Sequence, residues 1–218
     1  MKELIRRNIT FNAANLCVRE AAEGEPPSRI ITGYAIVFNT PSVILDADER
    51  TDVHEIIAPE AITEEVLKGS DIKMTLFHDN QLILARSNKG TGTLRYKIDD
   101  HGVYFEFEAP NTVDGDKALE LVRRGDISGC SFAFSTYYFD EKWVERTDSE
   151  EAGRKIITYT VRRVIAVHDF TLTPDPAYPD TSVEARSLIG AKSKANELAP
   201  EVAKQIDEMR KQIEKSLF

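Results

Sequence analysis

Residues 125–134 read GDISGCSFAF, in which a polar turn between two glycines precedes a short apolar run. Together with the residues that follow, segment 128–138 is rich in small and aromatic side chains and predicts a strand. Side chains of a strand alternate between its two faces. One face then carries large apolar side chains and the other carries small ones: Cys130, Phe132 and Phe134 on the first, and Ser131, Ala133 and Ser135 on the second. The first face belongs in a core, and the second is one that a substrate backbone can approach closely.

Similar segments recur from about residue 30 to residue 175, where β-branched and aromatic runs are broken by Gly, Asp, Asn and Pro. This pattern predicts an antiparallel sheet or barrel. The candidate strands cover residues 30–38, 72–78, 92–98, 103–109, 128–138 and 155–173, the last of which bends or divides. Between two of them, residues 99–102 read DDHG and predict a hairpin.

Two segments carry the signals of helices. Residues 59–69, PEAITEEVLKG, begin with a proline and acidic residues and end at a glycine. Residues 113–126, VDGDKALELVRRGD, end in two arginines followed by Gly125, which suits the C-terminus of a helix. The sequence therefore predicts an α+β protein made mainly of strands, with a few helices.

The composition changes after residues 173–187, TPDPAYPDTSVEARS, whose prolines end the sheet. Residues 187–196 have the composition of a linker. From Pro200 onward, apolar residues recur at helical spacing in a narrow stripe: Val202, Ile206, Met209, Ile213 and Leu217. A helix of this kind is expected to pack on a partner or on another copy of itself. We therefore expect one domain over residues 1–186 and a tail over residues 187–218.

Charge and composition argue against several classes of protein. The formal net charge of −9 makes a nucleic-acid binder by bulk electrostatics an unfavoured interpretation. No stretch approaches the about 18–20 apolar residues of a membrane helix, and the N-terminus lacks an apolar signal core, so we expect a cytoplasmic protein without a membrane partner. Cys17 and Cys130 are expected to be unpaired thiols. The histidines and cysteines lack the close spacing of metal ligands, so no metal and no cofactor is expected.

Of the adjacent Cys130 and Ser131, the serine is the better candidate nucleophile, because a catalytic thiol needs a polar, electropositive setting. In residues 72–79, IKMTLFHD, strand alternation places His78 at the strand end on the apolar side. A general base can occupy such a position when its second nitrogen is held in one tautomer. The alternative is that Ser131 is only a small residue in a crowded sheet and His78 a core or edge residue.

A third group would come from residues 164–178, VIAVHDFTLTPDPAY. His168 and Asp169 are adjacent there and lie on opposite faces of the predicted strand, so only one of them can serve.

Taken in order, these motifs resemble those of the tailed-bacteriophage prohead proteases, a capsid maturation family thought to share its fold with the herpesvirus assemblin proteases. The resemblance extends from about Arg6 to Arg186. It rests on six segments: GYAIVFNTPS (33–42), HEIIAPEAI (54–62), FHDNQLILARSNKGTGTL (77–94), RRGDISGCSFAF (123–134), KWVERTDSEEAGRKIITYTV (142–161) and VHDFTLTPDPAYPDTSVEARS (167–187). It implies a mainly antiparallel β-barrel with a few surrounding helices.

The resemblance assigns the histidine of the family's His-Asp motif to His78 and the serine of its Gly-x-Ser-Phe motif to Ser131. The family's acidic residue, most often glutamate, falls on Asp169, and a second histidine in the herpesvirus relatives keeps His168 as a rival. Two neighbouring positions also depart from the family pattern: Phe77 stands where asparagine is common, and Ala133 stands where glycine is common.

What the resemblance implies is a serine endopeptidase that acts inside the procapsid, in the cytoplasm of the bacterial host. It would cleave scaffold segments from the major capsid protein and also cleave itself, without a cofactor. Oligomers are expected, and a dimer suits the herpesvirus analogy. The tail over residues 187–218 would carry the protease into the shell and then be removed by self-cleavage.

By the same analogy, Arg162 and Arg163 are candidates for the oxyanion hole, with an exposed pair of arginines as the alternative. The competing hypothesis for the whole chain is a catalytically inactive scaffold or capsid-assembly chaperone with a protease-like fold. An esterase is disfavoured, because Ala133 occupies the place of the second glycine of a nucleophile elbow.

Overall fold

The computed structural model describes residues 5–11, 15–42, 46–47 and 50–174. The expected linker and tail helix, residues 187–218, lie outside the described residues.

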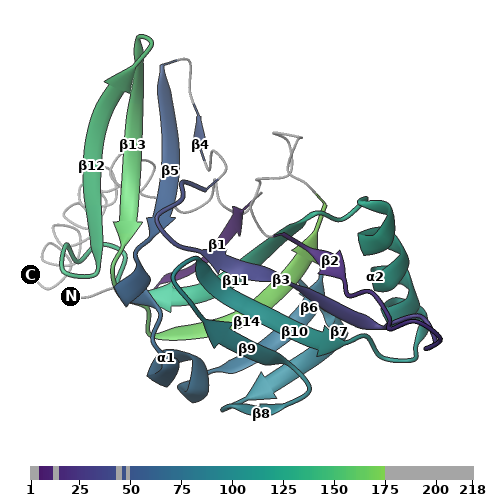
Figure 1. The fold of residues 1–218 in the computed structure, drawn as a ribbon. Coiled ribbons are helices and arrows are strands. Elements are labelled where there is room, and N and C mark those ends of the chain that lie inside the picture. Colours follow the sequence, from purple (N-terminus) through teal and green to yellow (C-terminus); the bar gives the residue numbers. More distant parts are fainter. Residues whose placement is uncertain (1–4, 12–14, 43–45, 48–49, 175–218) are drawn as a thin grey trace, which may run out of the picture. The chain divides into compact units, whose positions relative to one another are not determined.

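The strands of the described residues form three sheets (Figure 1). The first sheet has the order β1 (Ile5–Phe11), β11 (Gly129–Thr136), β14 (Ala166–Thr173), β6 (Asp71–Leu76), β7 (Asp79–Asn88), β8 (Thr91–Gly92). The second has the order β2 (Cys17–Val18), β3 (Ile30–Val37), β10 (Gly102–Glu108), β9 (Arg95–Ile98). The third has the order β12 (Val144–Glu151), β13 (Arg154–Val161), β5 (Thr51–Ile57), β4 (Asp46–Ala47). The helices among the described residues are a 3₁₀ turn (Pro59–Ala61), α1 (Glu64–Gly69) and α2 (Val113–Arg124).

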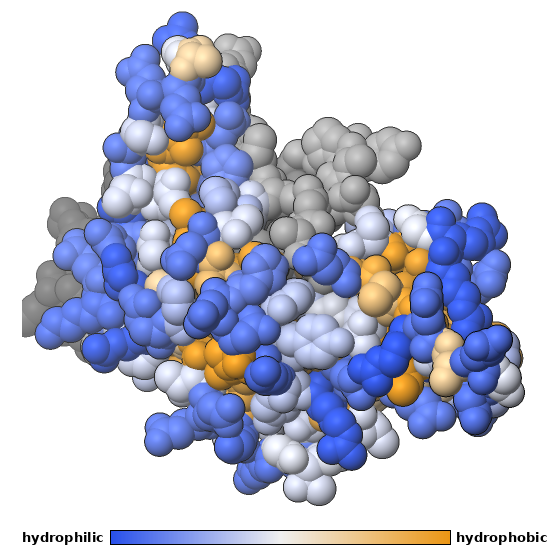
Figure 2. All heavy atoms as spheres, viewed as in Figure 1, coloured by the Kyte–Doolittle hydropathy of each residue, from blue (hydrophilic) through white to orange (hydrophobic). Residues whose placement is uncertain are grey.

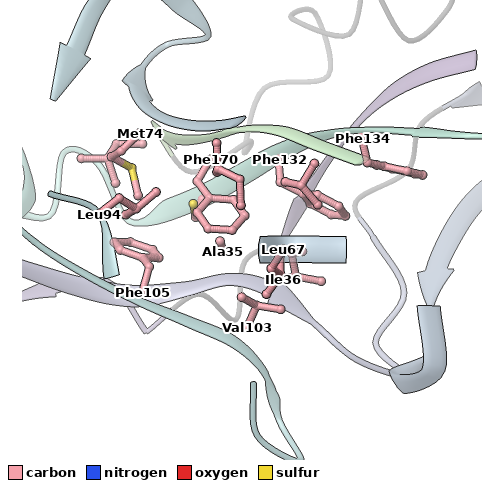
Figure 3. Close-up of a cluster of buried hydrophobic side chains, with 14 of the residues drawn as sticks. Ala35, Ile36, Leu67, Met74, Leu94, Val103, Phe105, Phe132, Phe134 and Phe170 are labelled. Atoms are coloured by element: carbon pink, nitrogen blue, oxygen red, sulfur yellow. The ribbon is translucent and has the colours of Figure 1, made fainter. Parts of the chain in front are cut away.

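The core lies between the first two sheets. Figure 3 shows side chains of β11, β14 and β6 facing those of β3 and β10, and the rings of Phe170 and Phe105 lie 6.4 Å apart across this space. Phe132 and Phe134 of β11 are fully buried in the same cluster, as the alternation predicts. Burying one such side chain contributes about 1.5–3 kcal/mol. Most of the face seen in Figure 2 is hydrophilic, with smaller hydrophobic areas between.

Both predicted helical segments contain helix, and their caps explain their ends. The Thr112 side chain accepts a hydrogen bond from the Gly115 N–H at the start of α2, and Gly125 ends the helix with a left-handed φ of 76°. The segment 59–69 divides into the 3₁₀ turn and α1, because Ile62 and Thr63 are extended and Thr63 caps α1 by accepting from the Val66 N–H. No helix of the described residues is long and apolar enough to cross a bilayer.

The expected antiparallel barrel is confirmed only in part. The described residues are mainly strands, but their three sheets are open and show no closed barrel. Two strand pairs are also parallel, β14 with β6 and β13 with β5. Local sequence pattern identifies strands but not distant partners, and both parallel pairs join segments far apart in the chain.

Most predicted strands lie near the observed ones. The predicted hairpin at residues 99–102 is confirmed, with Val103 opposite Ile98 and the Asp99 N–H donating to the Gly102 carbonyl. The segment 155–173 divides into β13 and β14, and the segment 92–98 is broken between β8 and β9. The predicted strands did not include β1, β5, β7, β12 or the two-residue strands β2 and β4. Most residues of β12 are exposed and polar, so this strand shows no apolar alternation.

The two helix ends offer a test of backbone strain. A Cβ at Gly125 or at Gly69 would meet open space, but only Gly125 has a positive φ. We expect Gly125→Ala to lower the free energy of unfolding by about 1 kcal/mol, because the left-handed conformation disfavours a Cβ. Gly69→Ala is the matched control and should leave stability unchanged or raise it by up to about 1 kcal/mol through helix propensity. Urea denaturation of both variants measures this, and equal losses would contradict the assignment of the cost to φ.

Candidate active site

Three predicted residues converge on one face of the first sheet. Ser131 lies on β11, Asp169 on the adjacent β14, and His78 in the turn that joins β6 to β7. In the β11–β14 register, Ser131 pairs with Thr171 and Ala133 pairs with Asp169. Ser131 and Asp169 are thus diagonal neighbours across the two strands. The Cα atoms of such a pair are about 7–8 Å apart. An imidazole ring fits between two side chains at that separation.

The imidazole of His78 joins the other two side chains by hydrogen bonds. Its Nε2 lies 3.0 Å from the Ser131 Oγ, and its Nδ1 lies 3.1 Å from the Asp169 Oδ1. A carboxylate only accepts hydrogen bonds, so Nδ1 carries the proton and Nε2 is left to accept from the serine hydroxyl. This tautomer lets the imidazole take the hydroxyl proton, which is the requirement for an activated serine.

Burial differs among the three side chains. Ser131 is 1% exposed and Asp169 is 4% exposed, whereas the His78 side chain is 30% exposed. The serine and the acid are therefore shielded from bulk water, which strengthens the hydrogen bonds that they make. The histidine is the member that solvent reaches.

His78 does not lie on a strand, so its predicted position at the end of a strand over residues 72–78 was wrong. Strand β6 ends at Leu76, which pairs with Asp79, so Phe77 and His78 form a two-residue turn. Their φ angles are 59° and 57°. Positive φ at both central residues is the feature of a type I′ hairpin turn, which usually contains Asn and Gly. Neither residue is present here, which explains why β7 was not predicted.

His168 is not brought to His78, although it is adjacent to Asp169. Its Nε2 lies 2.6 Å from the Ser135 Oγ, so β11 and β14 hold a second serine–histidine pair. The register of β14 shifts here, because Ala133 pairs with Asp169 while Phe134 pairs with Val167. This bulge re-aims His168 toward the polar face of β11, so the expectation that His168 and Asp169 lie on opposite faces was wrong. Of the two candidates, it is Asp169 that contacts His78.

Cys130 lies in the core, as predicted. It is fully buried in the same cluster as Phe132 and Phe134, and its Sγ lies 3.6 Å from the Ser131 carbonyl oxygen. Burial raises the pKa of the Cys130 thiol far above its usual range. A thiol in this state is not a nucleophile at neutral pH.

The predicted oxyanion arginines lie away from Ser131. The Arg162 guanidinium bonds Glu60 and Glu145, each at 2.8 Å, and the Arg163 guanidinium lies over the Trp143 ring. Thr136 donates to the Arg163 carbonyl, and this position on β11 is about 17 Å from Ser131 at the usual strand rise. Neither arginine is therefore placed to bind an oxyanion at the serine. Within the described part of the chain, no His, Cys, Asp and Glu side chains gather in threes as a metal site would require.

Comparison with known proteins identifies the family. The profile of the family described as Caudovirus prohead serine protease matches residues 15–195. The chain belongs to this family. Among solved structures, the bacteriophage T4 capsid assembly protease gp21 is similar at 12% sequence identity and a TM-score of 0.39, over 76% of this chain and 98% of that one. No curated protein sequence matches.

The environments of the two cysteines predict their reactivity. Because burial raises the pKa of the Cys130 thiol and Cys17 is exposed, iodoacetamide at about pH 8 should alkylate the folded protein once, at Cys17. Intact mass and peptide mapping measure this. Unfolding in guanidinium is the control and should allow a second alkylation at Cys130. Rapid labelling of Cys130 in the folded protein would contradict its place in the core.

Proposed function

We propose that this prohead protease family member is an active serine endopeptidase in which Ser131 is the nucleophile, His78 the general base and Asp169 the group that orients His78. The observation that carries the proposal is the continuous chain of hydrogen bonds from the Ser131 Oγ through both nitrogens of His78 to Asp169. The same three positions were assigned from sequence motifs alone.

In the first half of the reaction, the Ser131 Oγ attacks the scissile carbonyl carbon while its proton passes to the His78 Nε2. Asp169 accepts the Nδ1–H hydrogen bond throughout and stabilises the imidazolium that forms. When the tetrahedral intermediate collapses, the C–N bond breaks and the same Nε2 proton goes to the leaving amine. The product is an acyl ester on Ser131.

In the second half, water enters in place of the amine. His78 removes a proton from that water as it attacks the ester, and the proton then returns to the Ser131 oxygen as the acid product leaves. Base catalysis of this kind contributes about 10²- to 10⁴-fold. The exposed side of the His78 ring suits both steps, because the leaving amine and the water must approach Nε2 from solvent.

The substrates that we propose are scaffold segments of the major capsid protein and this chain itself, cut within the procapsid. Membership of the prohead serine protease family supports this assignment. Removal of residues 187–218 by self-cleavage and action as an oligomer belong to the same proposal.

Two serines of β11 provide the test. Co-expression with the major capsid protein of the same phage should shorten the capsid subunit and the protease, as measured by intact mass. Ser131→Ala should abolish both changes, since loss of a serine protease nucleophile lowers kcat by a factor on the order of 10⁶. Ser135→Ala is the matched control, because it removes a buried hydroxyl of the same strand, β11, whose partner is His168 of β14 and not His78. It should leave both cleavages intact.

Unchanged masses with the wild-type protein, together with normally assembled shells, would instead favour an inactive assembly chaperone. Equal cleavage by wild type and Ser131→Ala would assign the activity to another protein in the cell.

The role of Asp169 can be tested separately. Asp169→Asn keeps the shape of the side chain but lets its amide donate to Nδ1, which favours the wrong tautomer of His78. We expect kcat to fall by about 10⁴-fold, the cost of the same change in other serine proteases. Time courses of capsid-protein cleavage by the purified variant measure this, and His168→Gln is the control that should leave the rate nearly unchanged. A larger loss in the His168 variant would reverse the assignment.

A further inference from the structure

We infer that Thr171 and Thr75 form a buried hydroxyl pair that positions the backbone of His78, so that Thr171 is a positioning residue for catalysis. This inference rests on the proposed function, because it assigns Thr171 a role in holding the proposed general base against Ser131.

The pair lies directly beside the proposed nucleophile. Ser131 on β11, Thr171 on β14 and Thr75 on β6 are aligned across three neighbouring strands, because Ser131 pairs with Thr171 and Thr171 pairs with Thr75. Thr75 is 1% exposed and Thr171 is fully buried. Their Oγ1 atoms lie 2.7 Å apart and share a hydrogen bond.

The Thr171 hydroxyl also contacts the base directly. The His78 backbone N–H donates to the Thr171 Oγ1 at 2.8 Å. The Thr171 Oγ1 thus accepts the His78 N–H with one lone pair, and its O–H and second lone pair remain for the hydrogen bond with Thr75, in which either hydroxyl can donate. The preceding N–H of the turn, that of Phe77, donates to the Leu172 carbonyl at 3.1 Å. Both residues of the turn are therefore tied to β14, the strand that carries Asp169.

The turn needs this support because its own sequence does not favour its shape. Phe77 and His78 both have left-handed φ angles, which non-glycine residues adopt at a cost. Strained backbone of this kind persists only where surrounding contacts hold it, and such strain gathers at functional sites. If the hydrogen bond to Thr171 were lost, the turn would relax toward less strained φ angles. That movement would displace the His78 imidazole, and with it Nε2, from Ser131.

A merely structural role predicts a different result. A buried threonine that only completes the sheet should affect stability when it is replaced, but not the chemical step in the protein that remains folded. Displacing a catalytic group by about 1 Å, in contrast, costs about 10²-fold in rate. The two roles therefore separate when stability and chemistry are measured on the same variants.

The experiment compares Thr171→Val, Thr171→Ser, Thr75→Val and Thr136→Val in the full chain. Thr136 is the matched control, because it is another fully buried threonine of the first sheet, and its hydroxyl bonds the Arg163 carbonyl far from His78. A biotinylated fluorophosphonate serves as the probe, which reacts with an activated serine. Labelling rates at several probe concentrations give kinact and KI, peptide mapping identifies the labelled residue, and thermal unfolding reports stability.

We expect Thr171→Val to lower kinact by about 10²-fold with KI nearly unchanged, because the serine and the binding surface stay in place while the base is displaced. Thr171→Ser keeps the hydroxyl and should restore most of the rate. Thr75→Val should lower kinact less, since the bond between His78 and Thr171 remains. Thr136→Val should lose stability but keep its kinact.

The outcomes distinguish this inference from the function on which it rests. If the folded wild-type protein is not labelled at Ser131, the proposed function fails and the inference fails with it. If wild type is labelled but Thr171→Val has the same kinact, or Thr136→Val loses as much rate, only the inference is overturned. If Thr171→Val does not fold, Thr75→Val decides, and an unchanged kinact in that variant counts against the pair.

Discussion

The site depends on one constraint, the pairing of β14 with a different strand on each side. It runs antiparallel to β11 and parallel to β6. The first pairing sets Asp169 on the diagonal from Ser131, at a separation that one imidazole ring spans. The second pairing brings the end of β6, and with it His78, to the same place. A change in either register would move a member of the hydrogen-bonded chain by a whole residue, so the backbone pairing of the sheet fixes the geometry of the proposed site.

Local signals in the sequence were enough to locate several of the elements. Two arginines followed by Gly125 identified the C-terminal end of α2, and the hairpin at residues 99–102 followed from its turn residues. Alternation along β11 correctly separated the core side of Cys130 from the site side of Ser131. These features succeed because each depends on neighbours within a few residues. The family motifs then indicated which serine, histidine and acidic residue were the candidates for a catalytic triad.

What could not be predicted depends on contacts between distant segments. The local sequence patterns of β14 and β13 do not indicate that these strands pair in parallel with β6 and β5. The local sequence gives no sign of the bulge at His168 either. This bulge nevertheless determines the partners of two adjacent residues, because Asp169 bonds His78 while His168 bonds Ser135. Strand periodicity assumes an unbroken register and therefore assigned the two side chains to opposite faces. A single extra residue in one strand overturns that assumption.

The turn at Phe77 and His78 shows why local preference and tertiary structure disagree at this site. Asparagine would adopt the left-handed conformation at the first position with less strain than phenylalanine does. The chain holds both residues there nevertheless, and the two backbone N–H groups of the turn donate to residues of β14. The geometry of the proposed base is thus set by the strand that carries its acid and adjoins its nucleophile. One strand therefore sets the mutual geometry of all three groups before any substrate binds, which is what the proposed catalysis requires of a preorganised site.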